Sequence, residues 1–392
     1  MSFDIALSGI NAVNNQLGNI SNNIANTGTY GFKSSRTSFS AAYAGAQPMG
    51  VEVVGHSQNM ARNGNTVRTG RPLDAAIDGR GFFVSRDLNG GMAYSRVGIF
   101  NADKDGYLVD GFNRRVQGYG KADGNALGAF GDIKIPNGNI PAKASDKLQY
   151  VGNMSAGWSV QTVPFDKAQN TFNSSAVSTV YDSLGNKLNL TQYFCKTGPS
   201  TVTVHYTLDG VDLPTTATLN FDTDGKLTSP TAPVALNLGT PAGASPLAVK
   251  LDYTGTTQFA GESSQTLNAS NGYPSGSMTG TSLNDNGDVV AAYSNGQKQV
   301  VGTLAIANFP NESALQATSQ TSWVETAGSG TAVYSRPGAG LSGNLLAFTL
   351  EQSNVDMTSE LVDLMTAQRN YQANTKVIST ENQTIQALMQ AV

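Results

Sequence analysis

The side chains best suited to chemistry in this chain are carboxylates and amides gathered at glycine-containing turns. The segment Asn101-x-Asp103-x-Asp105-Gly106 begins like a calcium-binding loop, in which oxygen ligands alternate along the chain. The twelfth position of such a loop requires a bidentate glutamate, and Phe112 stands there instead. The calcium interpretation therefore lacks its strongest ligand.

Two further segments, 222–225 and 284–288, have the same composition and are incomplete in the same way. Asn and Asp side chains hydrogen-bond the backbone two residues on, and glycine supplies a positive φ. Asx–Gly hairpin turns therefore account for all three segments, and we expect no metal site and no cofactor.

Histidine and cysteine, the other usual sources of chemistry, are scarce. His56 and His205 each lie in a strand-like stretch, whereas an acid–base or metal site requires both together or one beside carboxylates. The single cysteine, Cys195, has no intrachain partner and is expected to be a buried free thiol. The zinc-protease, P-loop and nucleophile-elbow motifs do not occur. We therefore expect no catalytic residues and no enzyme activity.

The composition indicates a protein that is packed against other protein. Charged residues make up 13% of the 392 residues, against about 25% in ordinary soluble domains, and the formal net charge is −4. A soluble monomer requires charged surface, so this deficit favours a subunit packed against copies of itself. A mildly acidic chain without a basic block is not expected to bind nucleic acid.

The start of the chain lacks the basic and apolar regions of a cleavable signal peptide. No stretch reaches the roughly 20 apolar residues that a membrane span requires, so no membrane insertion is expected.

The N-terminal residues predict an amphipathic helix that ends at Asn26-Thr27-Gly28. Its apolar positions are spaced by three and four residues, which is a near-heptad pattern. Its other face is almost uncharged, which favours packing on more than one side. The stripe consists of Phe3, Leu7, Ile10, Val13, Leu17, Ile20 and Ile24.

The C-terminal residues predict a second helix with the same near-heptad spacing. Polar residues Gln368, Thr375 and Asn382 occupy alternate positions of its ladder, where they can fix register and partner number. The apolar positions that we assign to the assembly interface are Leu361, Leu364, Tyr371, Ile378 and Ile385.

The two helices flank a β-rich middle, so they most simply pair with each other and then with neighbouring subunits. A pair of ordinary core helices in a bundle is the alternative. Neither helix is long enough to be stable alone in water, so we expect both ends to be disordered in the free monomer.

The middle of the chain predicts β-structure. Alternating runs such as 81–85 and 92–97 are separated by Asn-Gly and Asp-Gly turns, and strand patterns resume near residue 300 after looser sequence. Residues 30 to 70 have weak periodicity and indicate an extended connector with short strands.

Motifs at both ends resemble the terminal signatures of bacterial flagellar rod and hook proteins. The N-terminal motif runs from Asn22 to Lys33 and the C-terminal motif from Ser353 to Asn374. The signature positions are Asn22, Asn23, Ala25, Asn26, Tyr30, Gly31, Phe32, Asn354, Val355, Asp356, Gln368, Arg369, Tyr371, Gln372 and Asn374.

Internal segments are similar to hook proteins in particular. Segment 180–186 resembles an outer-domain motif of hook proteins, and segment 293–297 resembles their return to the middle domain. Residues 79–83 with 94–100 resemble a motif that rod and hook proteins share.

The resemblance implies a mainly β fold with α-helical termini. The N- and C-terminal helices would pair as a coiled coil, and an outer β-domain would be inserted in a middle β-domain. The expected divisions are a helical inner-tube domain (1–30 and 354–392), a connector (31–69 and 346–353), a middle β-domain (70–148 and 285–345) and an outer β-domain (149–284).

The resemblance also implies a function as a structural subunit of the flagellar hook, a flexible hollow tube that acts as a universal joint between motor and filament. The implied location is extracellular, after type III export without cleavage of a signal peptide. The implied partners are further copies of the chain, the hook cap protein, the distal rod protein, the hook–filament junction protein and the flagellar export apparatus. A distal rod protein and, in a different class, a secreted β-rich adhesin are the alternatives.

Overall fold

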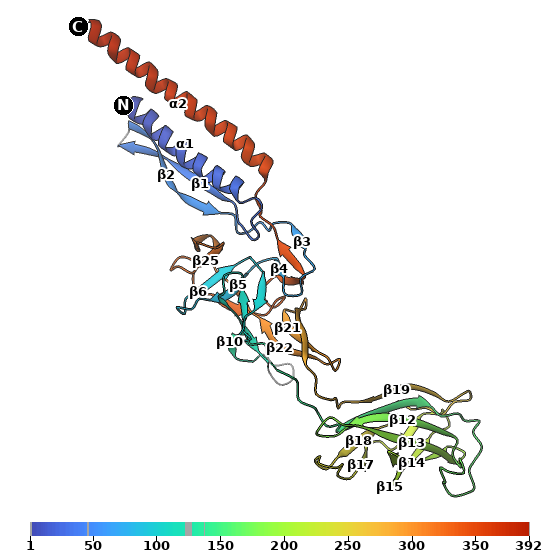
Figure 1. Ribbon diagram of the computed structural model, residues 1–392. Helices are drawn as coiled ribbons and strands as arrows, with labels where there is room; N and C mark the ends of the chain where they lie inside the picture. The colour runs from blue at the N-terminus through green and yellow to red at the C-terminus, as the bar shows by residue number, and fades with distance from the viewer. Residues whose placement is uncertain (1, 45–46, 122–127, 137, 392) are drawn as a thin grey trace. The chain divides into compact units, whose positions relative to one another are not determined.

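The computed structural model describes residues 2–44, 47–121, 128–136 and 138–391. Positions 1, 45–46, 122–127, 137 and 392, which fall within the expected domains, lie outside the described residues. The described chain is mainly β-structure with an α-helix at each end, which confirms the predicted fold class at this level (Figure 1). It divides into two compact units, each with its own hydrophobic core.

Unit 1 contains the residues up to 137, residues 280–292 and the residues from 298 onward. Its elements are α1 (Ser2–Ala25), β1 (Ser35–Ala44), β2 (Gln47–Gln58), β3 (Thr66–Arg68), β4 (Ala75–Asp78), β5 (Phe82–Arg86), β6 (Met92–Ser95), β7 (Phe100–Ala102), β8 (Leu108–Asp110), β9 (Arg115–Gly120), β10 (Phe130–Asp132), β20 (Met278–Leu283, which begins in unit 2), β21 (Asp288–Tyr293, which ends in unit 2), β22 (Lys298–Leu304), β23 (Ile306–Asn308), the 3-10 helix η1 (Glu312–Ala314), β24 (Gln316–Thr318), β25 (Ser322–Val324), β26 (Val333–Ser335), β27 (Asn344–Ala347), β28 (Thr349–Glu351) and α2 (Met357–Ala391).

The largest sheet of unit 1 follows the order β20-β21-β22-β9-β5-β6-β25-β24, and β1 and β2 form a separate antiparallel hairpin. The final strands of the chain return to early ones, because β27 pairs with β4 and β28 pairs with β3. The chain therefore enters α2 directly after strands that pair with β4 and β3.

The core of unit 1 explains the Gly-x-Gly-Phe-Phe motif. Phe82 in β5 packs on Trp323 with ring centroids 5.5 Å apart, and neighbouring Phe83 is also buried. Gly81 has φ +111°, and a Cβ there would lie 2.2 Å from Ile306. Glycine is required at this position because no other residue adopts that backbone in so little space.

Unit 2 contains residues 138–279 and 293–297 and packs two sheets face to face. One sheet has the order β12-β13-β14-β15-β16 and the other the order β17-β18-β11-β19. Inward side chains such as Val202, Val204 and Tyr206 alternate with outward ones, as in a sandwich. The strands are β11 (Lys147–Asn153), β12 (Ser174–Tyr181), β13 (Lys187–Gly198), β14 (Thr201–Leu208), β15 (Val211–Phe221), β16 (Leu227–Ser229), β17 (Val234–Asn237), β18 (Ala248–Asp252) and β19 (Ser264–Ser270).

The unit boundaries differ from the expected domain boundaries in three places. Residues 138–148 and 293–297, which we assigned to the middle domain, lie in unit 2, and residues 280–284 lie in unit 1. The physical reason is pairing, because the chain before β11 already forms β-bridges with residues 273 and 276 of unit 2. Segment 293–297 joins unit 2 through hydrogen bonds such as Asn295 Nδ2 to the Pro274 carbonyl, at 2.7 Å.

The predicted Asx–Gly turns are confirmed. Asp103 Oδ1 accepts hydrogen bonds from the backbone N–H groups of Asp105 (2.9 Å) and Tyr107 (2.7 Å), and Gly106 has φ +83°. Asp222 and Asn284 make the corresponding contacts at their own turns. The first Asp or Asn of each turn therefore accepts hydrogen bonds from the backbone of its own turn.

The connector contains longer strands than we expected. β1 and β2 span 10 and 12 residues, so the expectation of short strands is wrong for residues 35–44 and 47–58. Their many small and polar side chains show little alternation of apolar and polar residues. The hairpin lies against α1 (Figure 1). Tertiary packing accordingly stabilises strands that local sequence does not predict.

Cys195 is a buried thiol, as expected, and its burial leads to a testable pH dependence. Burial raises its pKa to about 11. Between pH ~8.5, where a free thiol ionises, and pH 11, the unfolded chain loses this proton first, so unit 2 is expected to lose up to ~3 kcal/mol of stability. Urea unfolding at pH 8 and pH 10.5 measures this loss of stability, which should be smaller in Cys195→Ala than in the native protein. Equal losses in both proteins would contradict this expectation.

Candidate assembly interface

The predicted N-terminal stripe divides between two faces of α1. Four of its residues pack toward α2: Val13 and Ile20 are 8% and 5% exposed, and Leu17 and Ile24 are partly buried around them. Near the start of the helix the stripe turns outward, so that Phe3 and Leu7 are 40% and 42% exposed and Ile10 is half-buried. The second half of the stripe is covered within the chain, and the first is largely not.

The C-terminal ladder meets α1 in a slightly different register from the predicted one. Ala367 is fully buried against Val13 and Ile20, with Leu364 beside it. Tyr371 and Ile378 continue this face, at 37% exposed and half-buried, respectively. The polar positions Gln368, Thr375 and Asn382 and the apolar Leu361 and Ile385 are all exposed. The seam therefore takes the neighbouring small residues rather than the predicted polar ones.

The signature residue Asn23 joins α1, the connector and α2. Its Nδ2 donates to the Ser35 carbonyl at 2.8 Å and to Glu360 Oε1 at 2.9 Å, and its Oδ1 accepts from the Ser35 N–H at 3.0 Å. Burial raises the pKa of Glu360, and the hydrogen bond from Asn23 opposes that rise. A single buried amide thus positions both terminal helices.

We expect Asn23→Leu to loosen the attachment of α1. The substitution leaves the Ser35 N–H and carbonyl without partners, at a cost of ~1–3 kcal/mol for a buried unsatisfied group. Amide exchange over residues 5–24 in the assembled protein should become faster, whereas exchange in unit 2 stays unchanged. Unaltered exchange in α1 would show that the amide is not needed for docking.

A second signature residue, Asn354, closes the connector just before α2. Its Oδ1 accepts from the Ser34 N–H at 2.7 Å, and its Nδ2 donates to the carbonyls of Asn59 and Arg62. Asp356 then starts the helix, because its Oδ1 accepts from the N–H groups of Thr358 and Ser359. These two residues set where α2 begins.

The remaining signature residues have simpler positions. Asn26 donates to the Asn22 carbonyl at the end of α1, and Gly31, with φ +66°, donates its N–H to the Glu351 carbonyl. Phe32 and Val355 are half-buried, and Asn374 lies beside Gly9 of α1. The exposed ones are Asn22, Ala25, Tyr30, Gln368, Arg369, Tyr371 and Gln372.

A buried charge cluster, formed by Lys33, Arg96 and Glu351, holds the connector, the core of unit 1 and β28 together. Lys33 Nζ lies 2.8 Å from Glu351 Oε1, and Arg96 Nη1 lies 3.3 Å from Glu351 Oε2, with all three side chains at most 1% exposed. Burial and then the nearby Arg96 lower the pKa of Lys33, and burial lowers that of Arg96. Sequence analysis did not single out Glu351, which lies just before the C-terminal motif.

The terminal elements also expose apolar side chains that their own chain leaves uncovered. On α2 these include Leu361, Val362, Leu388 and Met389, at 46% to 76% exposed. The hairpin adds Phe39, Tyr43, Met49 and Val54, at 39% to 67%. Exposed apolar surface of this extent is typical of a protein–protein interface.

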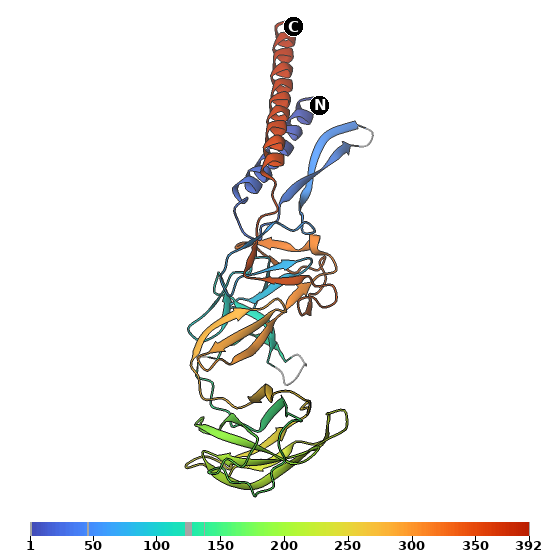
Figure 2. The ribbon, with the colours of Figure 1, turned by 90° about the vertical axis from the view of Figure 1, so that its right-hand side faces the viewer.

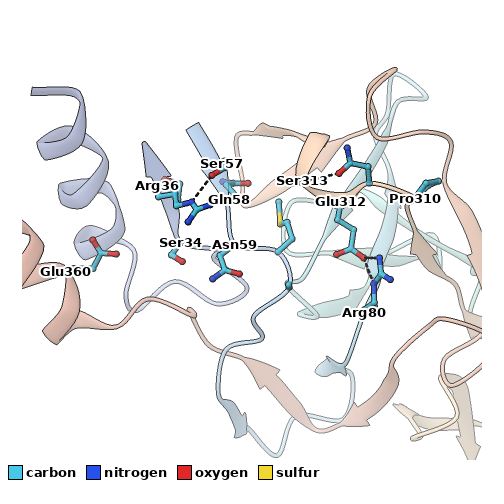
Figure 3. A pocket seen from close by; sticks show the side chains of 14 residues that line it. Ser34, Arg36, Ser57, Gln58, Asn59, Arg80, Pro310, Glu312, Ser313 and Glu360 are labelled. Atoms are coloured by element: carbon cyan, nitrogen blue, oxygen red, sulfur yellow. Dashed lines mark hydrogen bonds and ion pairs between the residues drawn. The ribbon is translucent and has the colours of Figure 1, made fainter. Parts of the chain in front are cut away.

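A cleft with a volume of about 740 Å³ lies at the base of the hairpin. Figure 3 shows Arg80 and Glu312 on one side, joined by an ion pair of 2.9 Å, and Arg36 hydrogen-bonded to Ser57 on the other. Half of the residues that line it are Ser, Asn or Gln. Nowhere in the described ranges do three His, Cys, Asp or Glu residues gather closely enough to hold a metal ion, and no described helix has the length and apolarity to span a bilayer.

Family models match three parts of the chain. Residues 76–151 match the "Flagellar hook protein FlgE/F/G D1 domain" and residues 153–273 match the "Flagellar basal body protein FlaE D2 domain". Residues 348–391, which contain α2, match the "Flagellar basal body rod FlgEFG protein C-terminal" model.

Full-length relatives agree with these matches. The chain is 37% identical to the flagellar hook protein FlgE of Escherichia coli K12 and 38% identical to that of Salmonella typhimurium LT2, over 99% of each chain. It is 32% identical to that of Brucella suis, over 98% of this chain and 96% of the relative. A crystal structure of Helicobacter pylori flagellar hook protein FlgE2 superimposes with a TM-score of 0.53 at 15% identity, covering 71% of this chain and 98% of that one, and so resembles it in fold.

Proposed function

This chain belongs to the flagellar hook protein family, and from that premise we propose that it is the structural subunit of a bacterial flagellar hook. Its role is mechanical rather than catalytic: many copies assemble outside the cell into a flexible hollow tube that transmits torque from the motor and rod to the filament. The observation that carries this proposal is identity of 37% over 99% of the chain and 99% of the relative.

We place the terminal helices, residues 1–30 and 354–392, at the inner wall of the tube, paired as a coiled coil. The buried contacts of Val13, Ile20 and Ala367 support this pairing, and the near-absence of charge on α1 supports further packing in the tube. The predicted interface residues remain our assembly determinants, because apolar burial there contributes roughly 25 cal/mol per Å².

We place the β-rich parts around the helices, as a middle domain and an outer domain inserted in it. The sequence ranges of unit 2, which interrupt those of unit 1, support the insertion. A bending, rotating tube must lengthen and shorten its outer contacts at every turn. Sparse charge allows these contacts to be weak and interchangeable polar ones, individually worth about 1 kcal/mol or less.

The other partners follow from the same assignment. The chain would leave the cell through the flagellar type III apparatus without cleavage, polymerise beneath the hook cap protein, and join the distal rod protein at one end and the hook–filament junction protein at the other. The distal rod protein is the nearest competing assignment, and the shape of the tubes separates the two.

Negative-stain electron microscopy of the purified chain after salting out tests the proposal. The comparison is a chain lacking residues 1–30 and 355–392. Curved hollow tubes from the full chain alone are expected, because only the full chain has the terminal interface. Straight, stiff tubes would indicate a rod protein. Globular monomers from both chains, with termini protected against amide exchange, would contradict the hook assignment and favour an adhesin.

A further inference from the structure

The end of α2 extends past the start of α1. Two contacts set the register of the antiparallel helices: Asn23 bonds Glu360, and Gly9 lies beside Asn374. Moving fourteen residues toward the start of α1 therefore corresponds to moving fourteen residues toward the end of α2. Seven further steps place Ser2 opposite Glu381. Residues 382–391 therefore project beyond the described start of α1 by about 15 Å, at 1.5 Å per residue (Figure 2).

This projecting segment is an uncharged amphipathic end. Ile385, Leu388 and Met389 share one face and are 48%, 63% and 76% exposed. Gln383, Gln386 and Gln390 share the opposite face at 100° per residue. The apolar face continues the same side of α2 that packs on α1 lower down, through Leu364, Ala367 and Ile378. The seam thus continues where its own chain has no partner helix to cover it.

A matching uncovered groove lies elsewhere on the same terminal elements. It has a volume of about 460 Å³ and runs between α1, the hairpin and α2, lined by residues that include Ile5, Gly9, Ala12, Phe39, Val51 and Ala373. Its lining contains no charged residue, and Ile5 and Phe39 are 38% and 39% exposed. The groove is continuous with the seam, since Val13 belongs to both.

We infer that the apolar face of Ile385, Leu388 and Met389 docks into this groove on a second copy of the chain. The chain cannot fill its own groove, because Ile385 lies eleven residues, about 17 Å, beyond Asn374 on one continuous helix. Both surfaces are uncharged and apolar, so they match chemically. A projection and a groove at different places on one chain make a head-to-tail contact, which propagates into an open helix when its rotation does not close into a ring. This inference rests on the proposed hook function and identifies one contact that would build the tube.

Disulfide trapping in assembled tubes tests the contact. In a Cys195→Ser background, which removes the native thiol, Leu388→Cys is combined with Ile5→Cys and the tubes are mildly oxidised. A ladder of covalent oligomers is expected on a non-reducing gel. The matched control combines Gln390→Cys, on the opposite face, with Ile5→Cys, and should give no ladder.

The outcomes separate this inference from the proposed function. Tubes without a ladder would overturn the docking contact and leave the hook assignment intact, and dimers from Leu388→Cys alone would overturn it in favour of a tip-to-tip contact. Failure of the unmutated chain to form tubes would remove both proposals.

A pair of charge variants gives an independent readout. Leu388→Glu is expected to raise the protein concentration needed for polymerisation at least tenfold, because it places a charge in an apolar groove. Gln390→Glu, which adds the same charge to the polar face, should change that concentration less than twofold. Equal effects of the two variants would overturn the inference.

Discussion

Replacing Ile20 with aspartate is expected to abolish tube formation while both β-rich units remain folded. Ile20 is 5% exposed and packs against Ala367 and Leu364 in the seam between the terminal helices. Burying a carboxylate there without a partner costs several kcal/mol, more than so small a cluster contributes. The measurement is electron microscopy after salting out, with urea unfolding to verify the β-rich units. We expect the same result for aspartate at Leu17, Leu364 or Ile378.

The matched control is Ile20→Val, which keeps an apolar β-branched side chain and removes one methylene group. Such a change typically costs roughly 0.5–1.5 kcal/mol of stability. Tubes should therefore still form, at a higher protein concentration than the native chain requires. Normal tubes from all four aspartate variants would show that the seam does not drive assembly. Loss of tubes together with unfolding of the β-rich units would show a general folding defect instead.

Replacing Glu351 with glutamine is expected to destabilise unit 1 by about 3–5 kcal/mol, because it removes the carboxylate that both Lys33 and Arg96 contact in the interior. The chain provides a convenient reporter. Its two tryptophans are Trp158 in unit 2 and Trp323 in the core of unit 1, so Trp323 fluorescence in a Trp158→Phe background follows unit 1 alone.

Glu52→Gln makes the same chemical change at an exposed position of the hairpin. It should change the free energy of unfolding of unit 1 by no more than about 0.5 kcal/mol. Replacing both Lys33 and Glu351 with methionine should recover part of the loss, because it removes a charge of each sign from the interior. A shift below about 1 kcal/mol in Glu351→Gln would show that the cluster is dispensable for the fold.

The features that sequence alone predicted are those set by neighbouring residues. Apolar residues three and four apart predicted a helix ending at Asn26, and α1 ends at Ala25. The Asx–Gly segments predicted tight turns, and Asp103 bonds the backbone N–H groups of its own turn. Both succeed because helix periodicity and side-chain-to-backbone hydrogen bonds act over a few residues.

Tertiary structure decided which of these residues face each other. The spacing of the C-terminal helix fits two adjacent stripes, and the structure brings Ala367 and Asn374, rather than Gln368 and Thr375, toward α1. A small side chain such as Ala367 allows the two helices to approach closely. The spacing alone does not show which stripe faces α1, because that depends on how the helices pack. The β1–β2 hairpin likewise packs on α1, and this packing stabilises its long strands. The local sequence therefore does not predict their length.

The buried charge cluster shows the same limit most clearly. Lys33 and Arg96 both lie in motifs that the sequence makes visible, but their shared partner Glu351 is 318 residues from Lys33. Nothing local to Glu351 indicates that it is buried, because the desolvation of a charge depends on what the rest of the chain places around it. The amino-acid sequence by itself therefore determined the family and the helical ends, whereas the folded chain determined which residues fasten those ends to the β-rich core.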